Sequence, residues 1–144
     1  MIRILAVGKM KDKRLSALAD DFYKRLRVMA PAEVVELKDS QPEKEARDMV
    51  SKLGSQGGSQ LVIAMDEHGE DLTSAQLADL LGKTGNICFL IGSSDGLGQE
   101  AKERAQRTIR LSSLTMTHEM ARVLLLEQIY RGLSILRGKP YHRA

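Results

Sequence analysis

The sequence has little of what marks an exported, disulfide-bonded or membrane protein. It contains a single cysteine, Cys88, so no internal disulfide can form. That cysteine lies within an apolar run, 86–92, where we expect a buried and unreactive thiol. Residues 1–8 are a short β-branched run interrupted by Arg3, unlike the apolar core of a signal peptide, and no apolar run approaches the roughly 18 residues of a membrane span. We therefore expect a cytoplasmic protein without membrane segments.

The chain also lacks a strong excess of either charge. Its 22 lysines and arginines face 19 acids, which gives a net charge of +3. Such a balance permits a nucleic-acid partner without requiring one. The distribution is uneven, because residues 121–144 contain five cations and one acid, whereas residues 33–48 contain six acids and three cations. The basic C-terminal end is either an ordinary solvated surface or part of a binding surface.

No nucleotide-binding motif is present. The glycine-rich segment 91–98 (IGSSDGLG) lacks the Lys-Ser/Thr of a P-loop, and its glycines do not have the dinucleotide-binding spacing. It therefore gives no indication of ATP or NAD. Its glycines allow a ligand to approach the backbone closely, and Asp95 can bind a hydroxyl group or cap a helix; a plain structural turn is the other interpretation.

Metal-ligand spacing is absent as well. His68, His118 and His142 have no cysteine or carboxylate pair at ligand spacing. The run Asp66-Glu67-His68 is typical of a polar loop. We therefore expect no metal site.

What the sequence does contain is a regular alternation of strand and helix patterns. We predict strands at residues 2–7, 33–37, 60–65, 86–91 and 108–111, and helices at residues 12–28, 42–53, 73–81 and 118–137. Continuous apolar strands indicate a parallel sheet covered on both faces, so the expected fold is a single α/β domain, residues 1–144, with an open doubly wound sheet. Ligands bind beyond the carboxyl ends of such strands, which makes the loops after Met65, Ile91 and Leu111 the candidate site.

The last predicted helix is apolar over more than half of its circumference. Such a helix must be buried on two sides. One side can lie on the sheet, and in so small a domain the other is expected to meet a second subunit, which predicts a homodimer. An unusually central helix in a monomer is the alternative.

A polar segment precedes this helix and another follows it. In residues 111–119 (LSSLTMTHE), Thr117 or His118 can cap the helix, with Glu119 near its positive end; a pocket-lining loop is the functional interpretation. The chain ends in GKPYHRA. These last residues are either a frayed terminus or a group that combines a stacking ring, an imidazole and a phosphate-binding guanidinium.

Together these segments resemble one family. Residues 111–131 (LSSLTMTHEMARVLLLEQIYR) and 140–143 (PYHR), with ILAVGK near the start and LIG at 90–92, resemble the RlmH family of ribosomal RNA methyltransferases, small members of the SPOUT superfamily. The likeness runs through the whole chain. It implies a parallel-sheet α/β-knot fold with a deep C-terminal trefoil knot, which periodicity does not reveal, and a homodimer packed through the last helix.

The resemblance also implies a function. It implies transfer of the methyl group of S-adenosylmethionine to N3 of a pseudouridine in 23S ribosomal RNA, with the ribosome as substrate. The family's cofactor-binding positions match Met65, Gly92, Leu111, Ser112, Ser113, Leu114, Thr115 and Met116. In the family dimer, the C-terminal tail of one subunit completes the active site of the other.

Methyl transfer to this imide nitrogen requires loss of its proton. We hypothesise from the residues themselves that His118 or His142 takes this proton or orients the edge of the uracil. Arg131 and Arg143 would stabilise the charge that develops on the carbonyl oxygens, and Tyr141 would stack on the base. Positioning of donor and acceptor would supply most of the acceleration.

Two positions depart from the family pattern. Ser93 stands where many relatives have a second glycine, which places a Cβ atom beside the cofactor loop. Gly132 follows Arg131 where relatives often have alanine, a change that costs about 1 kcal/mol of helix propensity. Neither touches the implied chemistry.

Three alternatives remain open at this point. They are a catalytically silent RNA- or ribosome-binding factor on the same fold, a small α/β nucleotide-binding enzyme of another chemistry, and the same methyl transfer to a different nucleotide. Binding of S-adenosylmethionine separates the first two from methyl transfer. Mass mapping of ribosomal RNA identifies the nucleotide.

Overall fold

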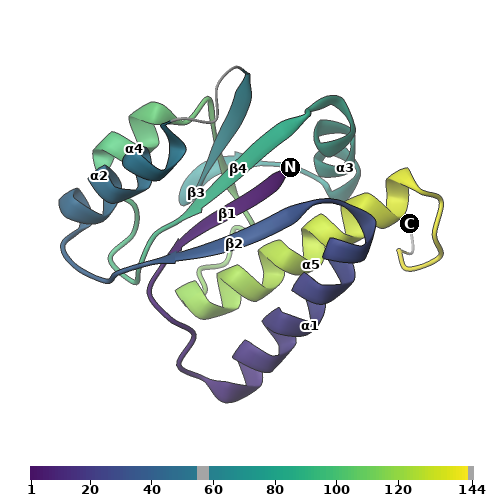
Figure 1. Cartoon of the computed structure of the whole chain (residues 1–144), viewed down its shortest axis with the longest axis horizontal. Helices are drawn as coiled ribbons and strands as arrows, with labels where there is room; N and C mark the ends of the chain where they lie inside the picture. Colours follow the sequence, from purple (N-terminus) through teal and green to yellow (C-terminus); the bar gives the residue numbers. More distant parts are fainter. Residues whose placement is uncertain (55–58, 143–144) are drawn as a thin grey trace.

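The computed structural model describes residues 1–54 and 59–142. Figure 1 shows strands and helices that alternate along the chain. The strands are β1 (Ile2–Val7), β2 (Ala32–Leu37), β3 (Gln60–Asp71), β4 (Asn86–Ile91) and β5 (Arg107–Arg110). The helices are α1 (Lys13–Met29), α2 (Pro42–Leu53), α3 (Ser74–Lys83), α4 (Gln99–Arg104) and α5 (His118–Leu136).

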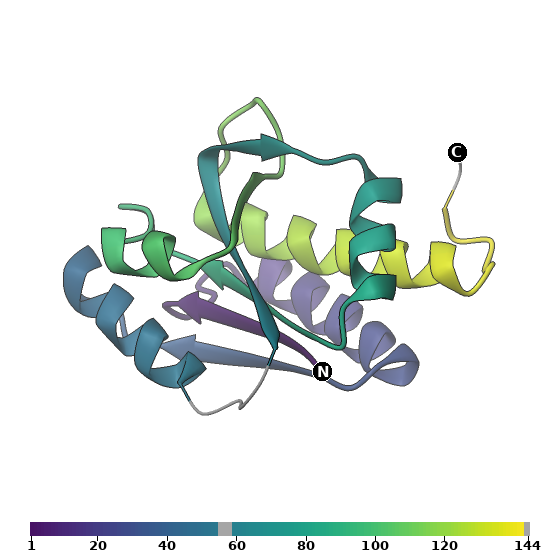
Figure 2. The same ribbon diagram turned by 90° about the horizontal axis from the view of Figure 1, so that it is seen from above.

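The strands form one parallel sheet in the order β2-β1-β4-β3-β5. Successive side chains of a strand point to opposite faces, and here both faces are apolar. In β4, Phe89 joins a core shared with α1, α3 and α5, whereas Cys88 and Leu90 join a second core shared with α2 and α4. Figure 2 shows α2 and α4 together, apart from the other three helices. The predicted parallel sheet covered on both faces is confirmed, as is the buried thiol, whose pKa burial raises to about 12.

Helix α5 lies between α1 and α3 and contacts both (Figure 1). Its residues Val123, Leu125 and Ile129 are almost completely buried. Two of its large apolar side chains, Met120 and Leu136, are exposed. The sheet and two neighbouring helices therefore bury most of the apolar circumference of α5 within one chain, and that circumference does not by itself require a second subunit.

Strand β3 runs well past Met65, where the sequence predicted its end. The predicted polar loop at Asp66-Glu67-His68 was therefore wrong. After a bulge, the extension of β3 pairs with β5 again, with Glu70 opposite Ile109. Gly69 permits this close crossing, because a Cβ atom there would lie 2.6 Å from the Ile109 backbone. The apolar pattern stops at Met65, but the backbone pairing does not.

The short helix α4 was not predicted either. It has one buried residue, Ala101, and one apolar contact produces no periodic pattern. The segment before it packs tightly on α2, because a Cβ atom on Gly98 would lie 2.3 Å from the Pro42 carbonyl oxygen. Apart from β3 and α4, the element boundaries agree with the predicted ones to within two residues.

Candidate functional site

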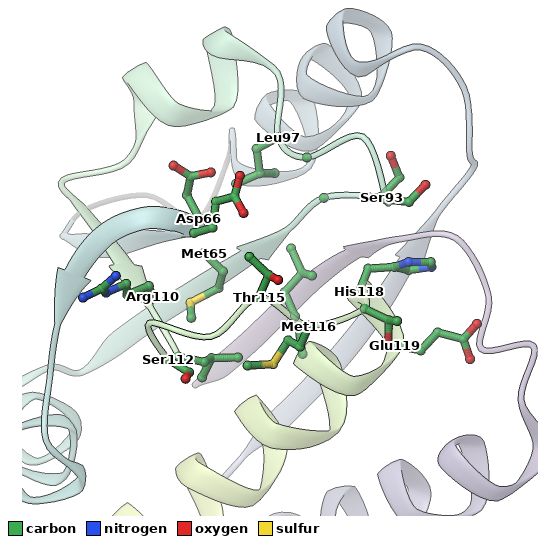
Figure 3. A pocket seen from close by; sticks show the side chains of 18 of the residues that line it. Met65, Asp66, Ser93, Leu97, Arg110, Ser112, Thr115, Met116, His118 and Glu119 are labelled. Atoms are coloured by element: carbon green, nitrogen blue, oxygen red, sulfur yellow. The ribbon is translucent and has the colours of Figure 1, made fainter.

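A cavity of about 900 Å³ opens at the carboxyl ends of β4 and β5, beside the part of β3 where its pairing with β4 ends. Figure 3 shows side chains from the β3 extension and from the segments after β4 and β5 converging on it. The sequence selected these three segments, although the first of them is strand and not the predicted loop. Among the predicted cofactor-binding residues, the cavity is lined by Met65, Gly92, Leu111, Ser112, Leu114, Thr115 and Met116, whereas Ser113 is not part of the lining.

One wall of the cavity is a tight turn in residues 92–98. A Cβ atom on Gly92 would lie 2.5 Å from the carbonyl carbon of Gly96. Gly96 itself has a φ of +83°, in the left-handed region that favours glycine, and its N–H donates to the Ser93 carbonyl oxygen at 2.9 Å. The backbone thus folds back on itself and presents main chain, rather than a side chain, at Gly92.

The Ser93 side chain links this turn to α2. Its hydroxyl donates to Glu45 Oε1 at 3.3 Å and accepts from the Asp95 N–H at 3.3 Å. Glu45 is buried, and its other carboxylate oxygen accepts from the Ser40 N–H at 2.8 Å. Burial raises the pKa of Glu45. The sequence marked Ser93 only as a departure from the family pattern and did not reveal this carboxylate partner.

Residues 111–117 form another wall. The Ser112 hydroxyl accepts from the Leu114 N–H at 3.0 Å and closes a local turn. Thr117 caps α5 by accepting from the Met120 N–H at 3.2 Å. The segment therefore lines the cavity and also caps the helix, so both interpretations of this segment hold.

His118, the first residue of α5, lines the cavity (Figure 3). Next to it, Glu119 Oε1 accepts from the N–H groups of Lys11 and Asp12, each at 3.0 Å. These bonds hold the segment between β1 and α1 at the cavity, where Asp12 and Leu15 join the lining. The sequence suggested Glu119 only as a favourable charge at the helix end, because nothing local indicates a partner 108 residues away.

The catalytic residues that the sequence predicted near the C-terminus form a separate cluster around Glu127. The Tyr141 hydroxyl donates to Glu127 Oε2 at 2.7 Å, and Arg131 donates to the same oxygen at 2.8 Å. Tyr130 packs edge-on against Tyr141, with ring centroids 4.7 Å apart. Burial, together with the adjacent Glu127 carboxylate, raises the pKa of Tyr141 to about 12. His142 Nδ1 is buried without a hydrogen-bond partner in the part of the chain that the structure describes.

This cluster lies away from the cavity. Arg131, Tyr141 and His142 are not among the lining residues. Glu127, which holds the cluster, comes nine residues after His118 on the same helix, about 13 Å along its axis. Arg143 lies outside the described residues. Within one chain, the structure therefore brings together the predicted cofactor residues and His118, but not the predicted catalytic tail.

A histidine–carboxylate contact, His68 Nε2 with Glu67 Oε1 at 3.4 Å, joins two exposed neighbours on the β3 extension. Within residues 1–54 and 59–142, no group of three or more His, Cys, Asp or Glu side chains is placed to hold a metal ion. No helix of those residues has the length and apolarity to cross a membrane.

Comparison with known families gives the class of protein. The family model described as predicted SPOUT methyltransferase matches residues 1–142. The chain belongs to the SPOUT methyltransferase family and is an enzyme of that class.

Individual relatives narrow the class. The chain is 40% identical over 143 residues to the ribosomal RNA large subunit methyltransferase H of Prochlorococcus marinus, an alignment that covers 98% of this chain and 94% of the relative. A protein of the same name from Caldicellulosiruptor bescii is 38% identical over 157 residues, covering 99% of this chain and 100% of the relative. The resemblance seen in the sequence is confirmed.

A solved structure shares the fold. The SpoU methyltransferase AviRb from Streptomyces viridochromogenes, in complex with the cofactor AdoMet, matches 95% of this chain with a TM-score of 0.53 and 12% sequence identity. The match spans 58% of that protein's chain. At this identity, the likeness shows the fold alone.

Proposed function

We propose that this protein is a cytoplasmic, S-adenosylmethionine-dependent methyltransferase that methylates N3 of a pseudouridine in 23S ribosomal RNA on the ribosome. One observation carries the proposal. In a chain whose residues 1–142 match the family model, a cavity lies where the resemblance predicts the cofactor-binding residues. Seven of the eight predicted cofactor residues line that cavity.

The cavity suits S-adenosylmethionine in size and chemistry. Its volume of about 900 Å³ is within the range of small-molecule sites. Met65, Leu111 and Met116 offer apolar surface for an adenosyl group, and the turn at Gly92 lets the cofactor approach the backbone closely. When bound, the cofactor supplies an electrophilic methyl group on a sulfonium. Ser113 stays in the proposed set as part of the same loop.

Of the proposed catalytic residues that the structure describes, His118 lines the cavity of its own chain. The pseudouridine N3–H must lose its proton for N3 to accept a methyl group. His118 lines the cavity, and on this proposal its imidazole takes that proton or holds the edge of the uracil. The surrounding loops fix the acceptor relative to the methyl donor.

The tail residues, on this proposal, act in the cavity of a second chain. We call the group of Glu127, Arg131, Tyr141 and His142 the tail cluster. The tail cluster does not line the cavity of its own chain. In a homodimer packed through α5, it would lie at the cavity of the partner. There Arg131 and Arg143 would stabilise the charge on the uracil oxygens, Tyr141 would stack on the base, and His142 would share the proton with His118. The two exposed apolar side chains of α5 support this packing.

We also propose the C-terminal trefoil knot that the resemblance implies. After β5, at the edge of the sheet, residues 111–117 line the same cavity as the β3 extension and the turn at residues 92–98, which supports the proposal. The chain then enters α5, which lies between α1 and α3. In a trefoil knot, the segment that leads to the terminus threads through a loop formed by the preceding chain.

Two measurements test the function. Calorimetric titration is expected to show saturable, micromolar binding of S-adenosylmethionine, and 23S ribosomal RNA from a strain without the protein should lack one methyl group on a pseudouridine. No cofactor binding would favour a silent ribosome-binding factor, and preferred binding of a flavin or NAD would favour another enzyme. A missing methyl group on another nucleotide would contradict the target.

A further inference from the structure

Residues 9–14, which lead from β1 into the first turn of α1, carry four cations, and we call these residues the basic loop: Lys9, Lys11, Lys13 and Arg14. All four side chains are exposed. Asp12 is the only acid in the loop, and it pairs with Arg14 at 3.0 Å. Among the described residues, no ion pair involves any of the three lysines. The loop therefore presents a net positive surface.

Helix α5 holds this loop in place at two points. The buried Arg122 donates to the Gly8 carbonyl oxygen at 2.8 Å, where a φ of +86° turns the chain out of β1. One turn earlier, Glu119 accepts from the N–H groups of Lys11 and Asp12. The helix that begins with His118 thus fixes the backbone of the basic loop beside the cavity.

Neither Glu119 nor Asp12, the two acids that are hydrogen-bonded to the backbone of the loop, forms an ion pair with its lysines. Glu119 is engaged by two backbone N–H groups, and Asp12 caps α1 by accepting from the N–H groups of Arg14 and Leu15 at 2.9 and 3.3 Å. Arg14 lowers the pKa of Asp12 to about 2, so this cap stays ionised and attached to the helix. The three lysine ammonium groups of the basic loop consequently remain available to an anion beside the cavity.

We propose that the basic loop binds the phosphate backbone of RNA next to the target nucleotide, so that the base enters the cavity from the side of His118 and Glu119. The inference rests on the proposed function and adds the surface that engages the substrate. S-adenosylmethionine carries no phosphate group, so the cofactor does not account for these cations. Lysines on a fixed backbone are suited to phosphates, which position a nucleic acid without reading its sequence.

The test uses the full-length double variant Lys11→Ala/Lys13→Ala, because neither side chain lines the cavity. The matched control is Lys44→Ala/Lys52→Ala, which removes the same charge from exposed positions on α2, on the other side of the sheet. Large ribosomal subunits from a strain without the protein serve as substrate. The measurements are KM and kcat for the subunits, the Kd for S-adenosylmethionine, and the salt dependence of subunit binding.

We expect the loop variant to raise KM for the subunits by about tenfold at physiological salt, with kcat at saturation and the cofactor Kd unchanged. The slope of log affinity against log salt concentration should become shallower by about 1.4, at about 0.7 for each cation that contacts single-stranded nucleic acid. Glu119→Ala should raise KM similarly, whereas Glu119→Gln, which keeps an oxygen acceptor for both N–H groups, should not.

An unchanged KM and salt slope, or an equal loss in the α2 control, would overturn the inference. So would a loop variant that binds protein-free ribosomal RNA as well as the wild type but binds subunits weakly, because the loop would then contact a ribosomal protein. Failure of the wild-type protein to bind S-adenosylmethionine or to methylate subunits would instead overturn the proposed function.

Discussion

At the scale of single residues, Gly92 is the position where the cavity depends most directly on the absence of a side chain. A methyl group there would lie 2.5 to 2.7 Å from the backbone of Gly96 and Leu97, which cannot move as a flexible side chain could. We predict that Gly92→Ala weakens S-adenosylmethionine binding at least tenfold, about 1.4 kcal/mol, because the turn must open. Calorimetric titration measures the loss.

The control for this prediction is Gly85→Ala. No heavy atom lies within 4 Å of a Cβ atom at Gly85, so that variant should bind the cofactor normally. Normal cofactor affinity in Gly92→Ala would show that the turn is not part of the cofactor site.

Glu45 gives a prediction about pH. Because burial raises its pKa in the folded protein, the native state holds a proton that the unfolded chain releases at a lower pH. The free energy of unfolding should therefore fall as pH rises from the ordinary carboxyl pKa through the raised one. Glu45→Gln cannot titrate and should flatten this dependence; its amide oxygen can accept from the Ser40 N–H, and its NH2 can donate to the Ser93 hydroxyl oxygen. Urea titrations at several pH values measure it, and an equally steep decline in both proteins would contradict the assignment.

The sequence predicted the lining residues well because parallel strands place their carboxyl ends at one edge. Gly92 and Leu111 follow from that rule alone, whereas Met65 lies where the apolar pattern of β3 stops and its pairing with β4 ends. The same rule could not predict the contacts of Glu45 and Glu119, because their partners lie 48 and 108 residues away. Nothing in the sequence near a carboxylate indicates which distant hydroxyl or N–H group it accepts from.

At the scale of elements, the extension of β3 across β5 depends on Gly69. We predict that Gly69→Ala destabilises the protein by about 1 to 3 kcal/mol, because its Cβ atom would overlap the backbone of Ile109. Hydrogen exchange should show the loss of protection first in residues 66–71. Gly85→Ala again serves as the control, with an expected change within about 0.5 kcal/mol.

Element boundaries were predictable wherever an apolar pattern marked them, as in β1, β4 and α5. The β3 extension was missed because its side chains are mostly polar, although its backbone pairs with β5. Helix α4 was missed because a single buried alanine does not produce a periodic apolar pattern. The glycine at position 132 shows a similar limit. The sequence treated it as a loss of helix propensity, yet a Cβ atom there would lie 2.9 Å from Leu81 and 3.3 Å from the Ala78 backbone, so its small size serves the contact between α3 and α5.

At the scale of the whole molecule, the separation of the tail cluster from the cavity makes the proposed dimer testable. A chain that ends at Lys139 should bind S-adenosylmethionine but not methylate, and His118→Ala should be inactive as well. If tails act in the partner's cavity, a refolded mixture of the two should regain about a quarter of the wild-type rate, since half of the dimers are mixed and each has one complete cavity.

A tail that served its own chain would give a different result. Neither variant then has a complete site, so the mixture would stay as inactive as each variant refolded alone. That outcome, or fully active monomers in solution scattering, would contradict the shared site.

The central position of α5 has a consequence for synthesis. The ribosome makes this helix after every strand of the sheet, yet Val123, Leu125 and Ile129 complete the core in which Ile4 and Phe89 are buried. Until α5 emerges, the part of the sheet between α1 and α3 stays exposed to water, and a prematurely terminated product would expose it to proteases and to other unfinished chains. This core can therefore be completed only once α5 has been made.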